Sequence, residues 1–333
     1  MLTDKFLRRI DYLRISITDK CNLRCIYCMP KEGVTLLPYE EILRNEEFIH
    51  FINIFISLGV RKIRFTGGEP LIRKGFVDII SKTKKLFPDI DLGLTTNGVL
   101  LDEVLDNLYS IQLHGLNISL DSMSRERYAM ITGRDYFYRV ISNIEKAIAF
   151  DFFNIKINSV LYEGTIEELE VFLDYFKEKN ITLRFIEKMP FTIDERLQSN
   201  VSCNDLINHL DRFGDLMRNK RMDTRVSMMY DFYYKNRYKM KIGIIPPMTH
   251  NYCHKCNRLR LTCDGFLKTC LLSNIEYDLK RPYRMGIGDN ALQQIILQAV
   301  SEKPKHHNHN SLYISDEGCS SLAPNRSMSK IGG

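Results

Sequence analysis

Two groups of cysteines have a spacing that suits a metal centre, and the first lies near the beginning of the chain. Cys21, Cys25 and Cys28 follow a predicted strand within a short loop, so three thiolates can reach one centre. A four-iron cluster held by three cysteines leaves one iron open to an outside ligand. Zinc would need a fourth ligand from elsewhere. Because the loop has no histidine nearby, we favour the cluster with an open iron.

The second group lies far along the chain, at Cys253, Cys256 and Cys270. Its spacing alone leaves two interpretations open, a structural zinc site and a second iron–sulfur cluster. A fourth zinc ligand could come from Cys263, His250 or His254. Arg258 and Arg260 follow directly, and their alternation at the start of a strand points both guanidiniums to one face. This places cations beside the metal centre.

Strands alternate with helices over the first part of the chain and position the first group. Strands are predicted at 13–18, 62–66, 91–95, 116–120, 155–160 and 182–186, and helices at 40–58, 75–86, 102–109, 138–150 and 165–179. This alternation is typical of a parallel α/β sheet. A partial barrel and a doubly wound sheet both fit, and either collects chemistry at the carboxyl ends of the strands.

The alternation of strands and helices ends at Pro190, so we divide the chain into two domains, residues 1–189 and 190–333. The aromatic-rich segment 228–245 predicts an antiparallel hairpin. A helix is predicted near 289–302, followed by a polar run at 303–310 and a Ser/Gly-rich tail. We expect the second segment to be a mixed domain that carries the second group of cysteines.

Composition and charge exclude several classes of protein. The 333 residues are 44% hydrophobic and 26% charged, which excludes a disordered chain, and the net charge is only +6. No apolar stretch is long enough to span a membrane, and the first residues lack the apolar core of a signal peptide. We therefore expect a cytoplasmic protein that acts on neither membranes nor nucleic acid, in which clustered cysteines bind metal.

The first loop, ISITDKCNLRCIYCMP, resembles the cluster loop of the radical S-adenosylmethionine (SAM) superfamily. The segment FTGGEP after the second strand fits the same superfamily. The resemblance implies a partial (β/α)6 barrel and a [4Fe-4S] cluster on Cys21, Cys25 and Cys28 whose open iron is chelated by SAM. The SAM contacts that it implies are Tyr27, Gly68, Glu69, Ser119 and Met189.

The segment NYCHKCNRLRLTCDGFLKTCL resembles the auxiliary-cluster signature of the GTP 3′,8-cyclase family, which acts first in molybdenum cofactor biosynthesis. The closing Gly332-Gly333 is similar to the tail of that family, which reaches into the active site. The resemblance implies a second [4Fe-4S] cluster on Cys253, Cys256 and Cys270, whose open iron binds the guanine of GTP. The catalytic residues that it implies are Arg258, Arg260, Gly332 and Gly333.

A triphosphate needs several converging cations. The residues that the resemblance assigns to GTP are Arg14, Arg64, Thr95, Lys156, Arg258 and Arg260. The sequence supports part of this set independently, because Arg14, Arg64 and Lys156 fall inside strands that such a sheet buries on both faces. A buried cation needs an anionic partner. A phosphate is one candidate, and a carboxylate such as Asp11 or Asp121 is the alternative.

The reaction implied by the resemblance begins with reductive cleavage of SAM and removal of a hydrogen atom from C3′ of GTP. The C3′ radical then attacks C8 of guanine, and a reduction gives 3′,8-cyclo-7,8-dihydro-GTP. Its partners are GTP, an external electron donor and the cyclic pyranopterin monophosphate synthase that acts next, with a homodimer as one option. Two alternatives stay open: a radical SAM enzyme that matures peptides, and a zinc-stabilised binding protein without catalytic activity.

Overall fold

The computed structural model describes residues 1–29, 33–150, 154–189, 201–250, 252–306, 326 and 328–332. Within these residues, one sheet of 12 strands runs in the order β12-β11-β10-β1-β2-β3-β4-β5-β6-β9-β8-β7. The strands are β1 Tyr12–Ser16, β2 Lys62–Thr66, β3 Asp91–Thr96, β4 Gly115–Ser119, β5 Asn154–Val160, β6 Thr182–Ile186, β7 Gly214–Arg218, β8 Met228–Tyr234, β9 Tyr238–Ile245, β10 Arg258–Leu261, β11 Phe266–Lys268 and β12 Tyr277–Asp278.

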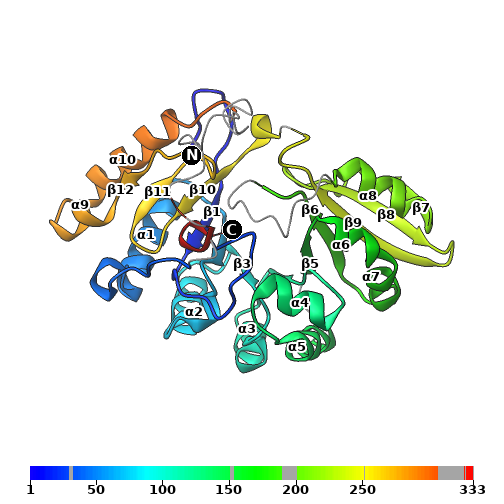
Figure 1. Ribbon diagram of the computed structural model, residues 1–333. Helices are drawn as coiled ribbons and strands as arrows, with labels where there is room; N and C mark the ends of the chain where they lie inside the picture. Colours follow the sequence, from blue (N-terminus) through cyan, green and yellow to red (C-terminus); the bar gives the residue numbers. More distant parts are fainter. Residues whose placement is uncertain are drawn as a thin grey trace, which may run out of the picture.

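The helices are α1 Asn45–Ser57, α2 Phe76–Leu86, α3 Leu105–Ser110, α4 Arg125–Thr132, α5 Phe137–Ala149, α6 Glu163–Glu167, α7 Leu169–Phe176, α8 Cys203–Leu210, α9 Lys280–Arg284, α10 Asp289–Ser301 and α11 Met328–Ile331. Helices α2, α3, α5 and α7 lie along the outer side of the curved sheet that β1 to β6 form (Figure 1). None of the described helices is long and apolar enough to cross a lipid bilayer.

Strand order decides between the two sheets that the sequence left open. β1 to β6 pair in parallel and in the order of the chain, whereas a doubly wound sheet reverses its order at a switch point. Continuous winding in one direction puts all the crossover helices on one face and curls the sheet toward a barrel. The sheet ends at β7 and β12 and stays open, which confirms the partial barrel.

Both edges of this barrel are extended by strands from the second half of the chain. β9 pairs in parallel with β6, and β10 pairs in parallel with β1. The antiparallel pair β8 and β9 is the predicted hairpin at 228–245, so that prediction is confirmed. The β10 pairing sets Arg260 opposite Arg14, and therefore joins the second cysteine segment to the strand that leads into the first.

The two faces of the inner strands have opposite character. In β1 and β2, Ile15 and Phe65 are fully buried on the helix side, where the Phe65 ring lies 5.9 Å from the Phe76 ring of α2. Arg14 and Arg64 occupy the alternate positions and are almost fully buried on the barrel side. The helices therefore supply the apolar core, and the barrel interior is left for charged side chains.

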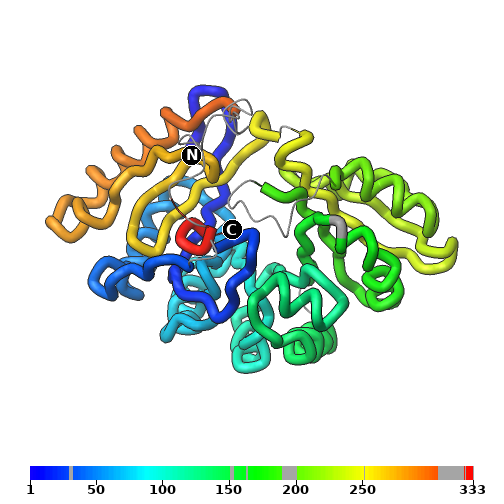
Figure 2. Tube along the Cα trace, in the orientation of Figure 1, coloured from blue at the N-terminus to red at the C-terminus, as the bar shows by residue number. Residues whose placement is uncertain are grey.

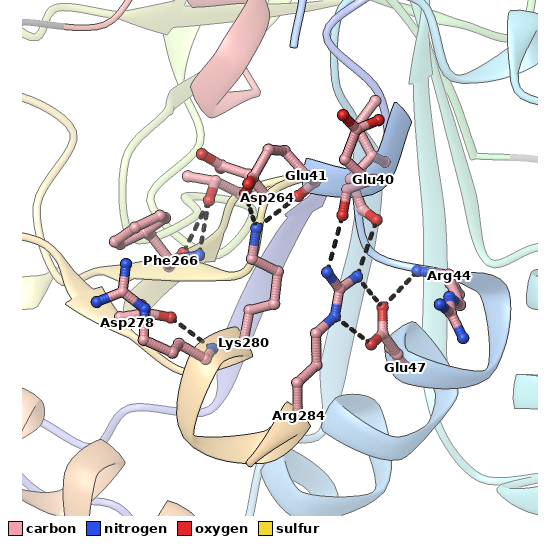
Figure 3. Close-up of polar contacts among 12 residues, drawn as sticks. Glu40, Glu41, Arg44, Glu47, Asp264, Phe266, Asp278, Lys280 and Arg284 are labelled. Atoms are coloured by element: carbon pink, nitrogen blue, oxygen red, sulfur yellow. Dashed lines mark hydrogen bonds and ion pairs between the residues drawn. The ribbon is translucent and has the colours of Figure 1, made fainter. Parts of the chain in front are cut away.

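Several helix predictions differ from the structure: the helix predicted at 165–179 is divided at Glu168 into α6 and α7, and the one predicted at 102–109 is a 3-10 turn at Leu101–Glu103 followed by α3. The helix expected from residue 40 begins at Asn45, because α9 holds the segment before it: Lys280 donates to the Glu41 carbonyl (2.9 Å) and Arg284 to the Glu40 carbonyl (2.8 Å), as Figure 3 shows. Helix α4 was missed because its apolar residues lack a regular stripe. Its ends did carry a signal, since Ser124 caps the first turn and Gly133 closes the last one in the left-handed region.

Candidate active site

The first cysteine group lies in the loop after β1. The Leu23 amide donates to the Cys21 sulfur (3.4 Å), and the Cys28 amide donates to the Cys25 carbonyl (2.9 Å). Burial raises the pKa of all three thiols, with that of Cys21 reaching about 11. A bound cluster would oppose this shift, since metal ligation favours the thiolate.

The Gly67-Gly68 pair packs against the backbone of the cysteine loop. The Gly68 amide donates to the Thr18 carbonyl and the Glu69 amide to the Lys20 carbonyl, both at 2.7 Å. A Cβ at Gly68 would overlap the Lys20 carbonyl, so only glycine allows this approach. Both glycines also line the cavity described below. The close packing of Gly67 and Gly68 against this loop therefore brings Glu69 beside the cysteines.

Glu69 is a buried carboxylate at the end of β2. Its oxygens accept from the Thr96 hydroxyl (2.7 Å) and from the backbone amides of Asn97 (2.7 Å) and Leu71 (3.1 Å). Burial outweighs these hydrogen bonds and raises the pKa of Glu69 to about 7. The side chain is thus fixed in place, and a nearby ammonium group would favour its charged form.

Tyr27 and Asp121 join the cysteine loop to the end of β4. The Tyr27 hydroxyl donates to Asp121 Oδ2 at 2.6 Å, and the Val160 amide donates to Asp121 Oδ1 at 2.9 Å. Ser119 and Met189 line the same cavity as Tyr27. The structure therefore brings together all five residues that the sequence assigned to SAM.

The second cysteine group lies before β10 and after β11. Cys253 begins a short turn, and its backbone carbonyl accepts a hydrogen bond from the Arg8 guanidinium (2.7 Å). Cys256 lies two residues before Arg258, where β10 begins. The pKa of Cys256 is lowered although burial raises it, because Lys303 and Arg258 lie close by. Cys263 is fully buried and lies outside the cavity lining. The described residues contain no three His, Cys, Asp or Glu side chains arranged around a single ion.

One cavity of about 330 Å³ receives both cysteine groups. The predicted residues that line it are Cys21, Cys25, Cys28, Cys253, Cys256, Cys270, Tyr27, Gly68, Glu69, Ser119, Met189, Arg14, Thr95, Arg258 and Arg260. The carboxyl ends of the strands and the segment before β10 thus face a common space. Two groups of three thiols in one cavity could hold two metal centres with a ligand between them.

A second cavity of about 640 Å³ continues from the first, since Arg14, Asn117, Arg184 and Arg258 line both. Its lining is rich in cations: Arg14, Lys62, Arg64, Lys156, Arg184, Arg225, Lys241 and Arg258. All of the described residues that the sequence assigned to GTP face one or other of these two cavities. The charge distribution suits an anionic ligand that extends from the cysteines into the barrel.

Sheet register explains how so many cations meet. Arg260, Arg14 and Arg64 lie side by side on three neighbouring strands, and Gly93 follows on the next. A Cβ at Gly93 would lie 2.7 Å from the Arg64 guanidinium, so glycine leaves room for that side chain. Arg64 donates to the Tyr12 hydroxyl (2.9 Å) and the Leu94 carbonyl (2.7 Å).

The carboxylates considered as alternative partners both have other partners, and Asp11 also pairs with one cation of the second cavity, Arg225, at 3.4 Å. Asp11 accepts from the Asn257 amide at 2.5 Å, and Asp121 accepts from Tyr27. The cations consequently repel one another in a buried space. Burial, and then the charges of Arg184 and Arg64, lower the pKa of Lys156 to about 7. Burial and Arg64 likewise lower the pKa of Arg184 to about 9.

Several buried polar atoms on the cavity walls have no hydrogen-bond partner among the described residues. They are Thr95 Oγ1, Asn117 Oδ1, Asn158 Oδ1, Arg184 Nε and Arg258 Nε. Each such atom costs about 1–3 kcal/mol when it stays unsatisfied. Donors and acceptors of this kind gathered at one cavity indicate a polar ligand. The residues present therefore fit a nucleotide bound between two metal centres.

Arg184 and Tyr12 are among the residues on these walls that the sequence reasoning did not assign. Arg184 lies in β6 and Tyr12 in β1, each facing the second cavity. The signal for Arg184 was available, because it is a charge inside a predicted strand, as Arg14 and Arg64 are. Tyr12 carried no such signal, since a tyrosine in a strand is usually a packing residue. Its hydroxyl is fixed by Arg64, and its ring lies 5.7 Å from the Arg258 guanidinium.

The C-terminal turn α11 lies against β1 (Figure 2). The Gly332 carbonyl accepts a hydrogen bond from Arg260, and its Cα lies so close to Thr66 that a Cβ would overlap that side chain. Gly332 also has a φ of +73°, which favours glycine. The tail therefore reaches a residue of the cavity. Gly333 lies outside the described residues.

Comparison with known proteins agrees with this arrangement. The model of the Radical SAM superfamily matches residues 15–176, and that of Molybdenum Cofactor Synthesis C matches residues 181–309. A GTP 3′,8-cyclase of Petrotoga mobilis is 38% identical over 100% of both chains, and one of Thermodesulfovibrio yellowstonii is also 38% identical over 100% of both. The chain belongs to the GTP 3′,8-cyclase family. It is also 39% identical to molybdenum cofactor biosynthesis protein 1 of Dictyostelium discoideum, covering 92% of this chain and about half (49%) of that one.

A solved structure outside the cyclase family supports the fold. SuiB of Streptococcus suis matches 90% of this chain and 67% of its own with a TM-score of 0.64 at 14% identity. The radical SAM fold is thereby shown. The cofactors are those of the cyclase family, SAM and two [4Fe-4S] clusters.

Proposed function

We propose that the chain is the radical SAM enzyme that converts GTP to (8S)-3′,8-cyclo-7,8-dihydroguanosine 5′-triphosphate, the first step of molybdenum cofactor biosynthesis. The observation that carries this proposal is the cavity in which two groups of three cysteines are followed by a line of buried cations. Cysteines at one end and cations at the other suit a ligand with a metal-binding base and a triphosphate.

The cofactors would be held by residues of this cavity. Cys21, Cys25 and Cys28 are proposed to hold the cluster that binds SAM, and Cys253, Cys256 and Cys270 the second cluster. SAM on its cluster supplies the radical chemistry of the family. Glu69 is placed to accept from the N–H groups of the SAM amino nitrogen, with Tyr27, Gly68, Ser119 and Met189 as the other proposed contacts.

The protein's own contribution would be to hold GTP at both ends. Arg14 and Arg64 are proposed to bind the triphosphate from the neighbouring strands β1 and β2, with Lys156 on β5, three strands further along the sheet, and Thr95 offers a hydroxyl from β3. Arg258 and Arg260 on β10 continue the row of positively charged side chains toward the second cysteine group. Fixing a substrate at two ends restricts the reacting atoms to one geometry, which accounts for a large part of catalytic power.

Arg258 and Arg260 also stand where the two halves of the chain meet. They lie on β10, which directly joins the segment 190–333 to β1 of the segment 1–189. We propose that the first segment acts as the SAM domain and the second completes the GTP site. Gly332, through its contact with Arg260, and Gly333 would then complete the substrate end of the cavity.

The decisive experiment is anaerobic incubation of the reconstituted protein with GTP, SAM and dithionite, followed by mass analysis. We expect cyclised GTP, and we expect Arg258→Ala to weaken GTP binding by about ten- to a hundred-fold through loss of a charge-assisted contact. Arg281→Ala, which removes an exposed arginine of α9, is the matched control and should leave binding unchanged. SAM cleavage without GTP consumption would point to a different radical SAM enzyme.

The remaining partners are also proposals. The enzyme would work in the cytoplasm with an external electron donor, and it would pass its product to the cyclic pyranopterin monophosphate synthase. A homodimer is the first oligomeric state to test, by sedimentation of the anaerobic protein. We propose neither nucleic acid nor membranes as partners; the net charge of +6 by itself argues neither for nor against nucleic acid.

A further inference from the structure

Arg326 makes a concentrated set of contacts just before the C-terminal turn. Its Nη1 lies 2.9 Å from Asp264 Oδ1 and 2.7 Å from Asp264 Oδ2, and its Nη2 lies 2.7 Å from Glu276 Oε2. The guanidinium also covers the Phe266 ring at 4.9 Å. The side chains are largely buried, with exposed fractions of 17% for Arg326, 7% for Asp264 and 16% for Glu276.

The partners of Arg326 lie in the hairpin that β10 and β11 form and in the segment that leads from it to β12, which pairs with β11. Asp264 lies in the turn between β10 and β11, Phe266 begins β11 (both labelled in Figure 3), and Glu276 precedes β12. Glu276 is fixed from its other side by the buried Lys268, at 3.0 Å. The same hairpin carries Arg260 on β10, so Arg326 is attached to the element that lines the cavity.

The residues after Arg326 reach two components of the proposed active site. The backbone of Ser329 makes a hydrogen bond to the thiol of Cys28. Ile331 is fully buried, and the Gly332 carbonyl accepts from Arg260. The segment 328–332 therefore touches a proposed cluster ligand and a proposed GTP ligand within five residues.

A turn as short as α11 does not hold its position by itself. Helix nucleation is unfavourable, and isolated helices of a few residues are not stable in water. Its placement must come from contacts with the rest of the protein, and the hydrogen bond of Ser329 to Cys28 is one of them. Arg260 and the buried Ile331 supply the contacts at one end, and Arg326 supplies a rigid, two-carboxylate attachment at the other.

We propose that Arg326 is a positioning residue: its attachment to Asp264 and Glu276 sets the position of residues 328–332, and so brings Gly332 onto Arg260 and Ser329 onto Cys28. The proposal rests on the proposed function only in that Arg260 and Cys28 belong to the active site. Arginine suits this task because its planar fork engages both carboxylates at once, whereas lysine is a single point charge. Arg326→Lys should therefore retain only part of the attachment.

Hydrogen exchange measured by mass spectrometry tests the attachment without any turnover. In Arg326→Ala, we expect the amides of 328–332 to exchange about ten- to a hundred-fold faster, the equivalent of one lost charge-assisted contact. Exchange in β10 and β11 should stay unchanged, and Arg326→Lys should give an intermediate rate. Arg281→Ala, an exposed arginine paired with Asp278 at 3.8 Å, is the matched control and should behave as the parent.

Two exchange results would overturn the proposal. Unchanged exchange of 328–332 in Arg326→Ala would mean that the turn is placed by other contacts. Equally faster exchange in the hairpin would mean that Arg326 only stabilises the fold. Because the measurement needs no substrate, either result leaves the proposed function standing, and failure of the parent to cyclise GTP leaves the attachment standing.

A kinetic readout connects the attachment to the reaction. We expect Arg326→Ala to lower kcat for cyclised GTP by at least about tenfold while the KM for SAM and the iron content stay at parental values. Partial recovery of kcat in Arg326→Lys supports the positioning role. An unaltered kcat in a variant whose tail exchanges faster would overturn it, because the position of the tail would then be irrelevant to turnover.

Discussion

The pH dependence of GTP binding should depend on Lys156. Burial and the nearby cations lower the pKa of this lysine to about 7 in the ligand-free protein, from an ordinary value of 10.5. The lysine therefore loses its proton as the pH rises through about 7. A triphosphate beside it favours the charged form and raises the pKa again. Binding above pH 7 must then take up a proton, so the affinity for GTP should fall as the pH rises.

The size of the pH effect on GTP affinity follows from the lowered pKa of Lys156. With a pKa of about 7, about half of the lysines are charged at pH 7 and about one in ten at pH 8. The Kd for GTP should rise by approximately tenfold per pH unit above pH 7. The loss is limited to about ten- to a hundred-fold in total, the value of one charge-assisted contact. The terminal phosphate of GTP is already largely ionised in this range, since its second pKa is about 6.

Anaerobic isothermal titration calorimetry between pH 7 and 9 measures both the Kd and the protons taken up, if two buffers of different ionisation enthalpy are compared. Lys156→Arg is the matched variant between pH 7 and 8, because arginine keeps its charge there; nearer pH 9 the neighbouring Arg184, whose pKa is lowered to about 9, also loses its proton. The Kd of Lys156→Arg should be nearly independent of pH between pH 7 and 8. Tyr12 lies among the same cations, and although burial raises its pKa, Arg64, Arg14 and Arg258 lower it to about 7. An equal pH slope in the parent and in Lys156→Arg would refute the reasoning, and its loss in Tyr12→Phe would assign the slope to the phenol.

Three further predictions concern the metal centres, the SAM site and the junction between the two halves. Anaerobically reconstituted protein should contain about eight irons, and replacing Cys253, Cys256 and Cys270 together by alanine should leave about half by iron assay; one zinc in place of four irons would contradict this. Burial raises the pKa of Glu69 to about 7, so SAM affinity should increase as the pH rises through 7 and lose this dependence in Glu69→Gln, as measured by equilibrium dialysis. Arg284→Ala removes two hydrogen bonds, of 2.8 and 2.9 Å, to the buried Glu47 of α1 (Figure 3), and should lower the free energy of unfolding by about 1–2 kcal/mol. Calorimetry should show this as a lower Tm. An unchanged Tm would show that the contact between α9 and α1 does not limit stability.

Local chemistry in this chain could be predicted from the sequence because it depends on residues that are neighbours along the chain. The spacing of Cys21, Cys25 and Cys28 within one loop already indicates a shared centre. The bounds of β2 and β6 agree with the predicted strands at 62–66 and 182–186, since both segments, KIRFT and TLRFI, are rich in β-branched and aromatic residues. The same pattern assigned the buried cations Arg14 and Arg64 to strands, which is why they could be expected to need an anionic partner.

Contacts between distant segments could not be predicted in this way, because hydrophobic periodicity does not specify which strands become neighbours. The pairing of β10 with β1 places Arg260 beside Arg14 although 245 residues separate them, and only strand register decides it. The sequence likewise does not show that Gly93 leaves room for the Arg64 side chain, because the two residues meet only when β2 and β3 pair. The sequence thus indicated which residues could carry the chemistry. The tertiary structure decided that cations from separate strands line common cavities, since charge repulsion among them is tolerated only where the packed sheet holds them together.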